Sequence, residues 1–301
     1  MSRVPHPIPY QGSKRRLATV ILRHSPTRVN CLFEPFAGSA ATTLAAAAKG
    51  LAHRYVIGDS LRPLAAIWEE ITCAPQSLIE AYASLWNGQH EDPKQHFNLV
   101  REQFNRERKP AQLLYLLARC VKNAVRFNPS GNFNQSADHR RSGMNPSKMR
   151  EEIKGASALL AGKTEVFAGD YDVLLDRAQL GDLVYMDPPY QGVSDTGDPR
   201  YYQQLDFDRL MGNLDRLNSR GVPFLLSFDG ACGNRTYGRP PPSELRLSQI
   251  LIHTGRSSQA TLNGEDAETV ESLYVSPSLS AEGERYFSVA SGPDSRQLSL
   301  L

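Results

Sequence analysis

The sequence is poor in cysteine, and it lacks both a long apolar run and a strong excess of either charge. Its four cysteines are scattered through 301 residues without a C-x-x-C pair, which argues against a zinc site or a disulfide framework and fits a reducing cytoplasm. No apolar run approaches the roughly 18 residues of a membrane span, and the N-terminal segment MSRVPHPIPYQGSKRRL lacks the apolar core of a signal peptide. We therefore expect a cytoplasmic protein that crosses no membrane and binds no metal.

The sequence does contain an alternation of strand and helix patterns. Apolar strand patterns at Val29–Phe33 and Arg54–Ile57 flank an alanine-rich helix pattern over Ala40–Lys49, which Gly50 can cap. Further on, the predicted strands are TEVFAGDY, GDLVYMDPPY, VPFLLSF and ETVESLYVS, and the predicted helix is FDRLMGNLDRLNSRG. This alternation predicts an α/β fold with an open, doubly wound and mostly parallel sheet.

The middle of the chain, from about Glu69 to Gly155, has a different pattern. PAQLLYLLARCVKNAVRF predicts one apolar-faced helix, and the turn-rich NPSGNFNQSADHRRSGMNPS predicts a hairpin. Between Arg101 and Lys154, twelve Lys and Arg residues accompany five Asp and Glu residues, a net charge of +7 against +2 for the whole chain. A solvated helical face would explain such a run, but the neighbouring Asn, Phe and Gly residues favour a nucleic-acid surface.

These patterns predict a division of the chain into four parts. We expect an α/β domain formed by residues 1–68 and 159–278, an inserted region over residues 69–158 that carries the basic surface, and a flexible tail over residues 279–301.

A turn with the sequence FEPFAGS joins the first predicted strand to the alanine-rich helix. At such a turn the backbone N–H groups face the crevice where open α/β sheets bind ligands, although a tight structural turn would look the same. The segment departs from G-x-G-x-x-G, so a dinucleotide is not its natural ligand. Asp59 ends the next strand, 21 residues after Gly38, where it could hold ribose hydroxyls or cap the following helix.

The most specific motif is Asp187-Pro188-Pro189-Tyr190, which directly follows a short buried strand pattern. By chance this tetrapeptide would occur in only about one in a thousand chains of this length. The Asp187 carboxylate and the Pro188 carbonyl can both accept hydrogen bonds from an amino group, and the ring of Tyr190 can stack on a flat heterocycle. Two such acceptors favour attack by an exocyclic aromatic amine, because they offset the positive charge that develops on its nitrogen.

Six segments in this order resemble the Dam-type (D12 class) DNA N6-adenine methyltransferases, which use S-adenosylmethionine. The resemblance covers roughly Pro9 to Ser276. PYQGSKRRL is similar to the family's W-x-G-G-K segment, FEPFAGSAATTL to its EPFxGSG turn, and IGDS to the strand end with the ribose-binding acid. VFAGDY is similar to its GDF segment beside the cofactor adenine, DPPY to its catalytic motif, and RFNPSGNFN to its R-Y-N-x-x-G-x-F-N hairpin for target recognition.

The resemblance implies a Rossmann-like methyltransferase sheet with an inserted target-recognition region, acting on N6 of an adenine flipped out of double-stranded DNA. The implied catalytic residues are Asp187, Pro188, Pro189 and Tyr190. The implied cofactor-binding residues are Tyr10, Lys14, Glu34, Pro35, Phe36, Ala37, Gly38, Asp59, Asp170, Tyr171 and Asp187. The expected DNA-binding residues are Lys122, Asn123, Arg126, Asn128, Asn134, Arg140 and Arg141.

This sequence departs from the family pattern at several positions. Ala40 stands where the family commonly has a second glycine, and Tyr10 replaces a tryptophan. After Asn134, QSADHRRSGMN does not follow the usual V-P-x-G continuation, so the target sequence GATC is not carried over. Two alternatives stay open. One is an N4-cytosine methyltransferase, although that class usually has serine in place of Asp187. The other is a non-catalytic DNA-binding protein, although such a protein would not need the intact Asp187 and Lys14.

The last five residues, Gln297–Leu301, follow the polar stretch SGPDSR. They resemble the bacterial sliding-clamp-binding pentapeptide Q-L-S/D-L-F, with leucine in place of phenylalanine. An extended tail of this kind can insert apolar side chains into a groove of a partner while a flexible tether holds the enzyme near DNA. The alternatives are a tail that folds back on its own domain and one that frays. We expect a nucleoid-associated enzyme that can bind a sliding clamp.

Overall fold

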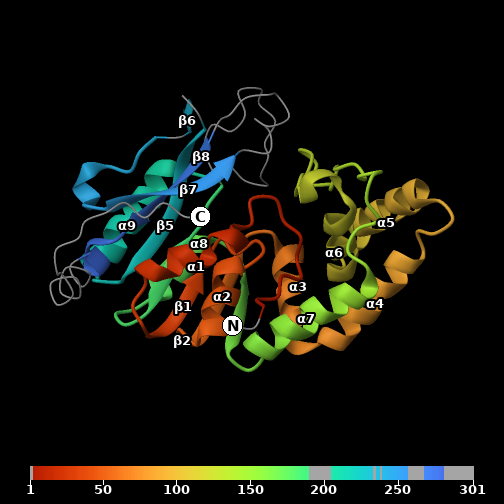
Figure 1. Ribbon diagram of the computed structural model, residues 1–301, viewed down its shortest axis with the longest axis horizontal. Helices are drawn as coiled ribbons and strands as arrows, with labels where there is room; N and C mark the ends of the chain where they lie inside the picture. Colours follow the sequence, from red (N-terminus) through yellow and green to blue (C-terminus); the bar gives the residue numbers. More distant parts are fainter. Residues whose placement is uncertain (1–2, 190–204, 233–234, 238, 257–267, 281–301) are drawn as a thin grey trace.

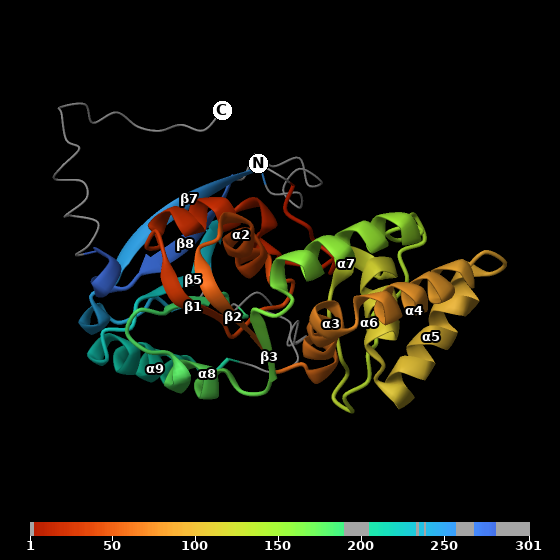
Figure 2. The ribbon, with the colours of Figure 1, turned by 90° about the horizontal axis from the view of Figure 1, so that it is seen from below.

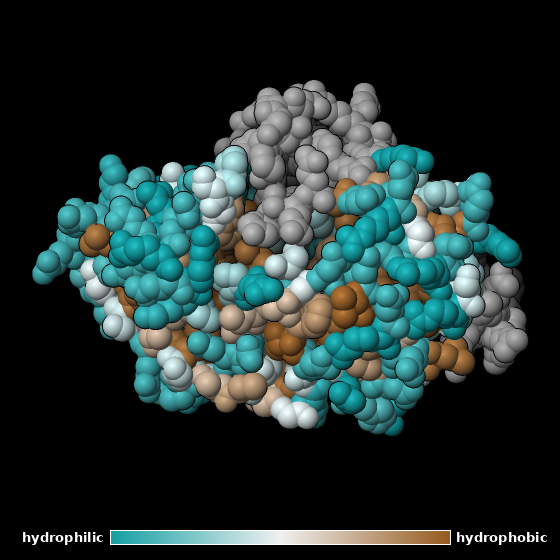
Figure 3. Space-filling model, turned by 180° about the vertical axis from the view of Figure 1, so that it is seen from behind, coloured by the Kyte–Doolittle hydropathy of each residue, from teal (hydrophilic) through white to brown (hydrophobic). Residues whose placement is uncertain are grey.

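The computed structural model describes residues 3–189, 205–232, 235–237, 239–256 and 268–280. The predictions made for Tyr190 and for the pentapeptide Gln297–Leu301 lie outside these residues. Among the described helices, none combines the length and apolar character needed to cross a bilayer. On the face shown in Figure 3, apolar residues form scattered groups between hydrophilic ones.

A mostly parallel sheet forms the centre of the larger lobe, in the strand order β3-β2-β1-β4-β5-β8-β7, with β6 paired to β5 (Figure 1). Its parallel strands are β1 (Val29–Glu34), β2 (Ala52–Asp59), β3 (Thr164–Ala168), β4 (Leu183–Met186) and β5 (Phe224–Cys232). The antiparallel strands are β6 (Arg235–Tyr237), β7 (Ser248–Arg256) and β8 (Glu268–Val275). The predicted α/β fold with a mostly parallel sheet is confirmed, whereas β6 and β7 were not predicted.

Helices cover both faces of this sheet (Figure 2). On one face lie α1 (Ala18–Ile21) and α2 (Ala41–Lys49), and on the other lie α8 (Tyr171–Arg177) and α9 (Phe207–Ser219). Neighbouring strand residues alternate between the two apolar cores, as Leu32 and Phe33 do on β1. Gly50 ends α2 in the left-handed conformation, with a φ of 66°. The predicted cap is therefore present.

The smaller lobe is helical and lies beside the sheet (Figures 1 and 2). It contains α3 (Arg62–Cys73), α4 (Pro75–Asn87), α5 (Pro93–Glu107), α6 (Pro110–Arg119) and α7 (Pro146–Leu160). Each of these helices has a proline in its first turn, where the fixed φ of proline suits a helix start. The boundary predicted between residues 68 and 69 falls inside α3 and not in a loop between two elements. The division of the chain into four parts stays a prediction. Short 3₁₀ turns occur at Lys14–Arg16 (η1), Leu22–His24 (η2), Val121–Asn123 (η3) and Ser243–Leu245 (η4).

The helix predicted over residues 110–127 was wrong in its length. It ends at Arg119, because Cys120 is extended, with φ of −77° and ψ of 162°, and pairs with Ala137. Further on, Lys122 and Asn123 are both left-handed, with φ of 59° and 53°. Tertiary contacts favour this ending: the Asn123 side chain donates to Leu117 O at 2.7 Å, and its carbonyl accepts from Gln11 N–H at 3.0 Å. After this break the chain forms the predicted hairpin, with antiparallel bridges between Phe127 and Phe133 and between Cys120 and Ala137.

Candidate functional site

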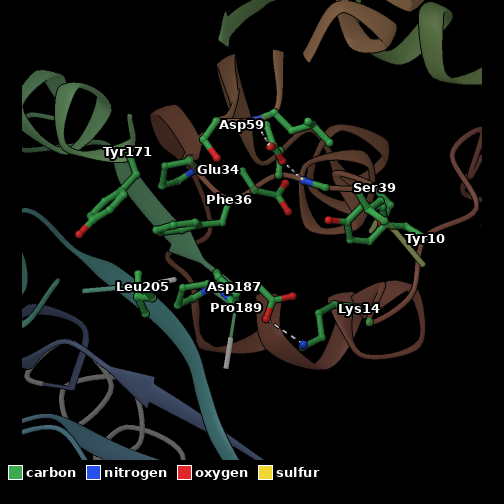
Figure 4. Close-up of a pocket in the computed structure, with 18 of the residues that line it drawn as sticks. Tyr10, Lys14, Glu34, Phe36, Ser39, Asp59, Tyr171, Asp187, Pro189 and Leu205 are labelled. Carbon is green, nitrogen blue, oxygen red and sulfur yellow. Dashed lines mark hydrogen bonds and ion pairs between the residues drawn. The ribbon is translucent and has the colours of Figure 1, made fainter. Parts of the chain in front are cut away.

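A pocket opens where the carboxyl ends of β1, β2, β3 and β4 meet (Figure 4). Because parallel strands bring their carboxyl ends to one edge, the residues that follow them converge there although they are far apart in sequence. The residues of the predicted cofactor and catalytic sets that line this pocket are Tyr10, Lys14, Glu34, Pro35, Phe36, Ala37, Gly38, Asp59, Asp170, Tyr171, Asp187, Pro188 and Pro189. All the predicted cofactor-binding residues therefore share one pocket.

The turn after β1 brings its backbone close to both Asp59 and Tyr10. Gly38 has a φ of +49°, and its N–H donates to Asp59 Oδ2 at 3.1 Å. A Cβ atom at Gly38 would lie 3.1 Å from the ring of Tyr10, so glycine permits this approach. Ala40, the position of the family's second glycine, is also left-handed, with a φ of 44°. The turn therefore keeps the left-handed conformation at position 40, although alanine replaces the glycine that the family commonly has there.

Asp59 ends β2 with its carboxylate at the pocket wall. Besides Gly38 N–H, the carboxylate accepts from Leu61 N–H at 2.9 Å, so it holds the turn between β2 and α3. Burial raises the pKa of Asp59 to about 6, and the two backbone hydrogen bonds oppose that rise. The alternative that Asp59 is the N-cap of the next helix is wrong: the N-cap of α3 is Leu61, and no side chain caps this helix. The Asp59 carboxylate lines the pocket.

Glu34 is buried at the base of the same pocket. Its carboxyl accepts from Thr43 N–H at 2.8 Å and from the Thr43 hydroxyl, at the start of α2. Burial raises the pKa of Glu34 to about 8, more than the hydrogen bonds from Thr43 lower it. At neutral pH Glu34 is therefore mostly protonated in the folded protein.

Two aromatic rings and an ion pair form one end of the pocket. The ring centroids of Phe36 and Tyr171 are 4.8 Å apart, tilted by 36°. Arg209, from α9, forms an ion pair with Asp170 at 2.9 Å, and its guanidinium lies 5.3 Å from the centre of the Tyr171 ring. Sequence reasoning missed Arg209, because nothing in its local helical pattern shows that it reaches Asp170.

The other end of the pocket holds Asp187, directly after β4. Lys14 Nζ donates to Asp187 Oδ1 at 2.8 Å, and this contact is drawn in Figure 4. Burial raises the pKa of Asp187, and the Lys14 ammonium lowers it. The Lys14 side chain is itself buried, and Glu271 Oε2 lies 3.5 Å from its ammonium. Sequence reasoning placed Lys14 with the cofactor; the structure brings it to the Asp187 carboxylate.

The predicted DNA-binding residues lie on the hairpin and on the loop that follows it. Lys122 and Asn134 are exposed, and Asn134 N–H donates to Arg126 O at 3.1 Å. Asn128 is used within the turn, where its side chain accepts from Asn132 N–H at 2.9 Å. Val125, at the base of the hairpin, lines the pocket. The hairpin therefore lies beside the pocket.

Arg140 and Arg141 both contact Asp138, whose side chain is only 4% exposed. Hydrogen bonds to its carboxylate, mainly from Arg140 and to a smaller extent from Arg141, lower the pKa of Asp138 to about 2. Arg141 also donates to Cys120 O at 3.2 Å, whereas the Arg140 side chain is 85% exposed. The two arginines therefore differ: Arg141 ties the loop to the end of α6, and Arg140 extends into solvent.

Known proteins resemble this chain over most of its length. The family described as D12 class N6 adenine-specific DNA methyltransferase matches residues 10–285. The Type II methyltransferase M1.LlaDCHI of Lactococcus lactis subsp. cremoris is 28% identical over 233 residues, 72% of this chain and 78% of the relative. The DNA adenine methylase of Vibrio cholerae is 26% identical over 261 residues, 82% of this chain and 89% of the relative. The family match spans both the pocket and the hairpin beside it.

Proposed function

This chain belongs to the D12 class of N6 adenine-specific DNA methyltransferases, and from that premise we propose that its pocket binds S-adenosylmethionine next to a flipped-out adenine. The protein is an adenine-specific DNA methyltransferase, and enzymes of this kind generally take their methyl group from S-adenosylmethionine. The N6 atom of a stacked adenine cannot be reached in line by a methyl donor, so the base has to leave the duplex.

The residues of the pocket fit S-adenosylmethionine by their chemistry. Asp59 offers a carboxylate to the ribose hydroxyls, and Asp170 offers one to the adenine amino group beside the Phe36 and Tyr171 rings. The glycine at position 38 leaves room where a Cβ atom would crowd Tyr10. When bound, the cofactor supplies an electrophilic methyl group on a positively charged sulfur, which the acidic lining of the pocket favours.

The observation that carries the proposal is the placement of Asp187 in the same pocket as the cofactor-binding candidates. In our proposal the Asp187 carboxylate and the Pro188 carbonyl accept the two N–H groups of the target amine. They orient the nitrogen lone pair and offset the positive charge that the nitrogen gains on attack. Lys14 favours the ionised form of Asp187, which is the stronger acceptor and carries the negative charge that offsets the charge on the nitrogen. Tyr190 would stack on the flipped base.

The test is the Asp187→Ala variant, with Asp176→Ala on the exposed side of α8 as a matched control. Loss of one such acceptor costs about 10²–10³ in rate, so we expect Asp187→Ala to lose methyl transfer while its cofactor affinity stays within a few-fold. Mass spectrometry of nucleosides from incubated DNA reports N6-methyladenine, N4-methylcytosine or no product. Near-normal turnover by a folded Asp187→Ala protein would refute the role of Asp187.

We also propose that the hairpin and its flanking loop contact DNA, with Lys122, Asn123, Arg126, Asn128, Asn134, Arg140 and Arg141 as the candidate residues. The support is the position of Val125, at the base of the hairpin, in the lining of the pocket, and the concentration of positive charge between Arg101 and Lys154. Methylation-sensitive sequencing of DNA from a host that expresses this chain would give the modified base and its sequence context together.

A sliding clamp is a further proposed partner, through the pentapeptide Gln297–Leu301. The support is the sequence resemblance alone, together with the advantage of tethering the enzyme to replicated DNA at the nucleoid. A peptide of these residues should bind purified clamp saturably, and the peptide with Gln297 and Leu300 changed to alanine should not. Equal binding by both peptides would exclude this partner without affecting the catalytic assignment.

A further inference from the structure

Arg209 holds three consecutive residues of the segment that follows β3. It lies in the first turn of α9 and belongs to the lining of the pocket. Its guanidinium forms ion pairs with the carboxylates of Asp170 and Asp172, and its Nε donates to Asp172 Oδ2 at 2.6 Å. Its Cζ atom lies 5.3 Å from the centre of the ring of Tyr171, the residue between the two acids. One side chain from a distant helix therefore restrains this stretch, of which Asp170 and Tyr171 line the pocket.

The Asp170 carboxylate is restrained at both of its oxygens. Oδ1 accepts from Asp172 N–H at 3.1 Å, which makes Asp170 the N-cap of α8, and Oδ2 lies 2.9 Å from the Arg209 guanidinium. An ionised carboxylate has about four lone-pair sites, so these two contacts leave room for a further donor. The Asp170 side chain is half-exposed, so packing does not hold it in place, and the loss of Arg209 would free Oδ2.

The contacts with Asp172 have a purely structural explanation. Asn213, one turn along α9 from Arg209, donates to Asp172 Oδ1 at 2.5 Å, so both residues join α9 to the start of α8. Helix packing alone does not require the further contact with Asp170. The side chains of Arg209 and Asp170 are 44% and 46% exposed, and an ion pair this exposed contributes little to folding stability. The contact with Asp170 is therefore better explained by what it does in the pocket.

We propose that Arg209 is a positioning residue for the cofactor: it holds the Asp170 carboxylate and the Tyr171 ring in the arrangement that selects an adenine. This inference rests on the proposed binding of S-adenosylmethionine in this pocket. Adenine offers an N–H donor at its position 6, which a carboxylate accepts. Hypoxanthine has an oxygen at that position, and a carboxylate held in place by Arg209 repels it. A carboxylate that is free to turn away would discriminate less between the two bases.

The experiment measures by calorimetry the binding of S-adenosylhomocysteine and of S-inosylhomocysteine, its hypoxanthine analogue. We expect the parent protein to prefer the adenine compound by about 10-fold to 100-fold, because the analogue leaves the carboxylate without its donor. Arg209→Gln should bind S-adenosylhomocysteine about 3-fold to 10-fold more weakly, since Asp170 then has to be ordered on binding, and its preference for adenine should fall by at least about 3-fold. A ratio of two affinities does not depend on the fraction of folded protein, so a loss of stability alone would not change it.

Two control variants separate positioning from helix packing. Asp172→Asn weakens the contact between α8 and α9 but keeps the Arg209–Asp170 pair, so it should keep the preference for adenine. Arg177→Gln removes a similarly exposed ion pair, with Glu165 at 2.6 Å, and Arg177 is not among the described residues that line the pocket. This variant should match the parent protein in both affinities.

A parental preference for adenine in Arg209→Gln would overturn the inference and leave the cofactor assignment of the pocket intact. An equal loss of preference in Asp172→Asn and Arg209→Gln would also overturn it, because helix packing would then explain both. If the parent protein binds neither compound, or binds both equally, the proposed placement of the cofactor adenine fails, and the role of Arg209 fails with it.

Discussion

Glu34→Gln should remove a specific pH dependence of folding stability. In the folded protein the pKa of Glu34 is raised from 4.5 to about 8, which corresponds to about 5 kcal/mol at about 1.4 kcal/mol per pKa unit. Below the unfolded pKa both states are protonated and the group contributes no pH dependence. As pH rises from 4.5 towards 8, the unfolded state loses its proton and the folded state keeps it, so stability falls.

The measurement is urea unfolding of the cofactor-free protein between pH 5 and pH 8. We expect the stability advantage of the parent over Glu34→Gln to shrink by about 3 kcal/mol across this range, since glutamine keeps the acceptor for Thr43 N–H but cannot ionise. Asp59, with its own raised pKa, is present in both proteins and cancels in the comparison. Parallel stability curves for the two proteins would refute the burial of an ionisable Glu34.

Three further outcomes are expected. Asp59→Asn should weaken S-adenosylmethionine binding by about 10-fold to 100-fold, since a charge-assisted hydrogen bond contributes about 1.5–3 kcal/mol. The cofactor affinity of the parent protein should fall as pH drops through about 6, and calorimetry that finds neither effect would limit Asp59 to its contacts with Gly38 and Leu61. Ala40→Gly should change the free energy of unfolding by less than about 1 kcal/mol, because relief of the left-handed φ offsets the lost methyl group. Ala45→Gly in the interior of α2 should cost about 1–2 kcal/mol in thermal or urea unfolding. Arg140→Ala should lower the slope of DNA affinity against salt concentration by about 0.9 per lost phosphate contact and leave the melting temperature unchanged. Arg141→Ala should lower the melting temperature as well, because Arg141 also holds Asp138 and the Cys120 carbonyl. A lower melting temperature in Arg140→Ala and an unchanged one in Arg141→Ala would contradict these contacts.

The acids of the pocket were predictable from the sequence for a physical reason. Asp59 and Asp187 each follow an apolar strand pattern, and parallel strands present their carboxyl ends at one edge of a sheet. The pattern of apolar residues along the sequence therefore predicts which residues lie at the carboxyl-terminal edge of the sheet. The alanine-rich α2 and the short β4 were predictable because local propensity and packing agree there.

Contacts between distant segments could not be predicted in the same way. The predicted helix ends early because Cys120 is extended and pairs with Ala137, and helix propensity does not contain a partner 17 residues further along the chain. Arg209 and Glu271 have no motif of their own, and their relevance follows only from the acids or cations that they contact. The roles of Arg140 and Arg141 differ because only the folded loop buries Asp138 beneath them.

The acids of the pocket are held in two physically different ways. Backbone N–H groups hold Glu34 and Asp59, through Thr43 in one case and through Gly38 and Leu61 in the other. Thr43 and Leu61 belong to the same strand-turn-helix units as the acids that they hold. Gly38 lies in the turn after β1, so its hydrogen bond to Asp59 joins two neighbouring units.

Side-chain cations hold the two outer acids, and they come from elsewhere in the chain. Asp170 pairs with Arg209 of α9, and Asp187 pairs with Lys14 of the N-terminal segment. A long-range pair exists only after both segments have docked on the sheet. The two ends of the pocket are therefore completed by tertiary structure. Because burial raises the pKa of Asp187 and the Lys14 ammonium lowers it, the docking of the N-terminal segment favours the carboxylate form of this acceptor.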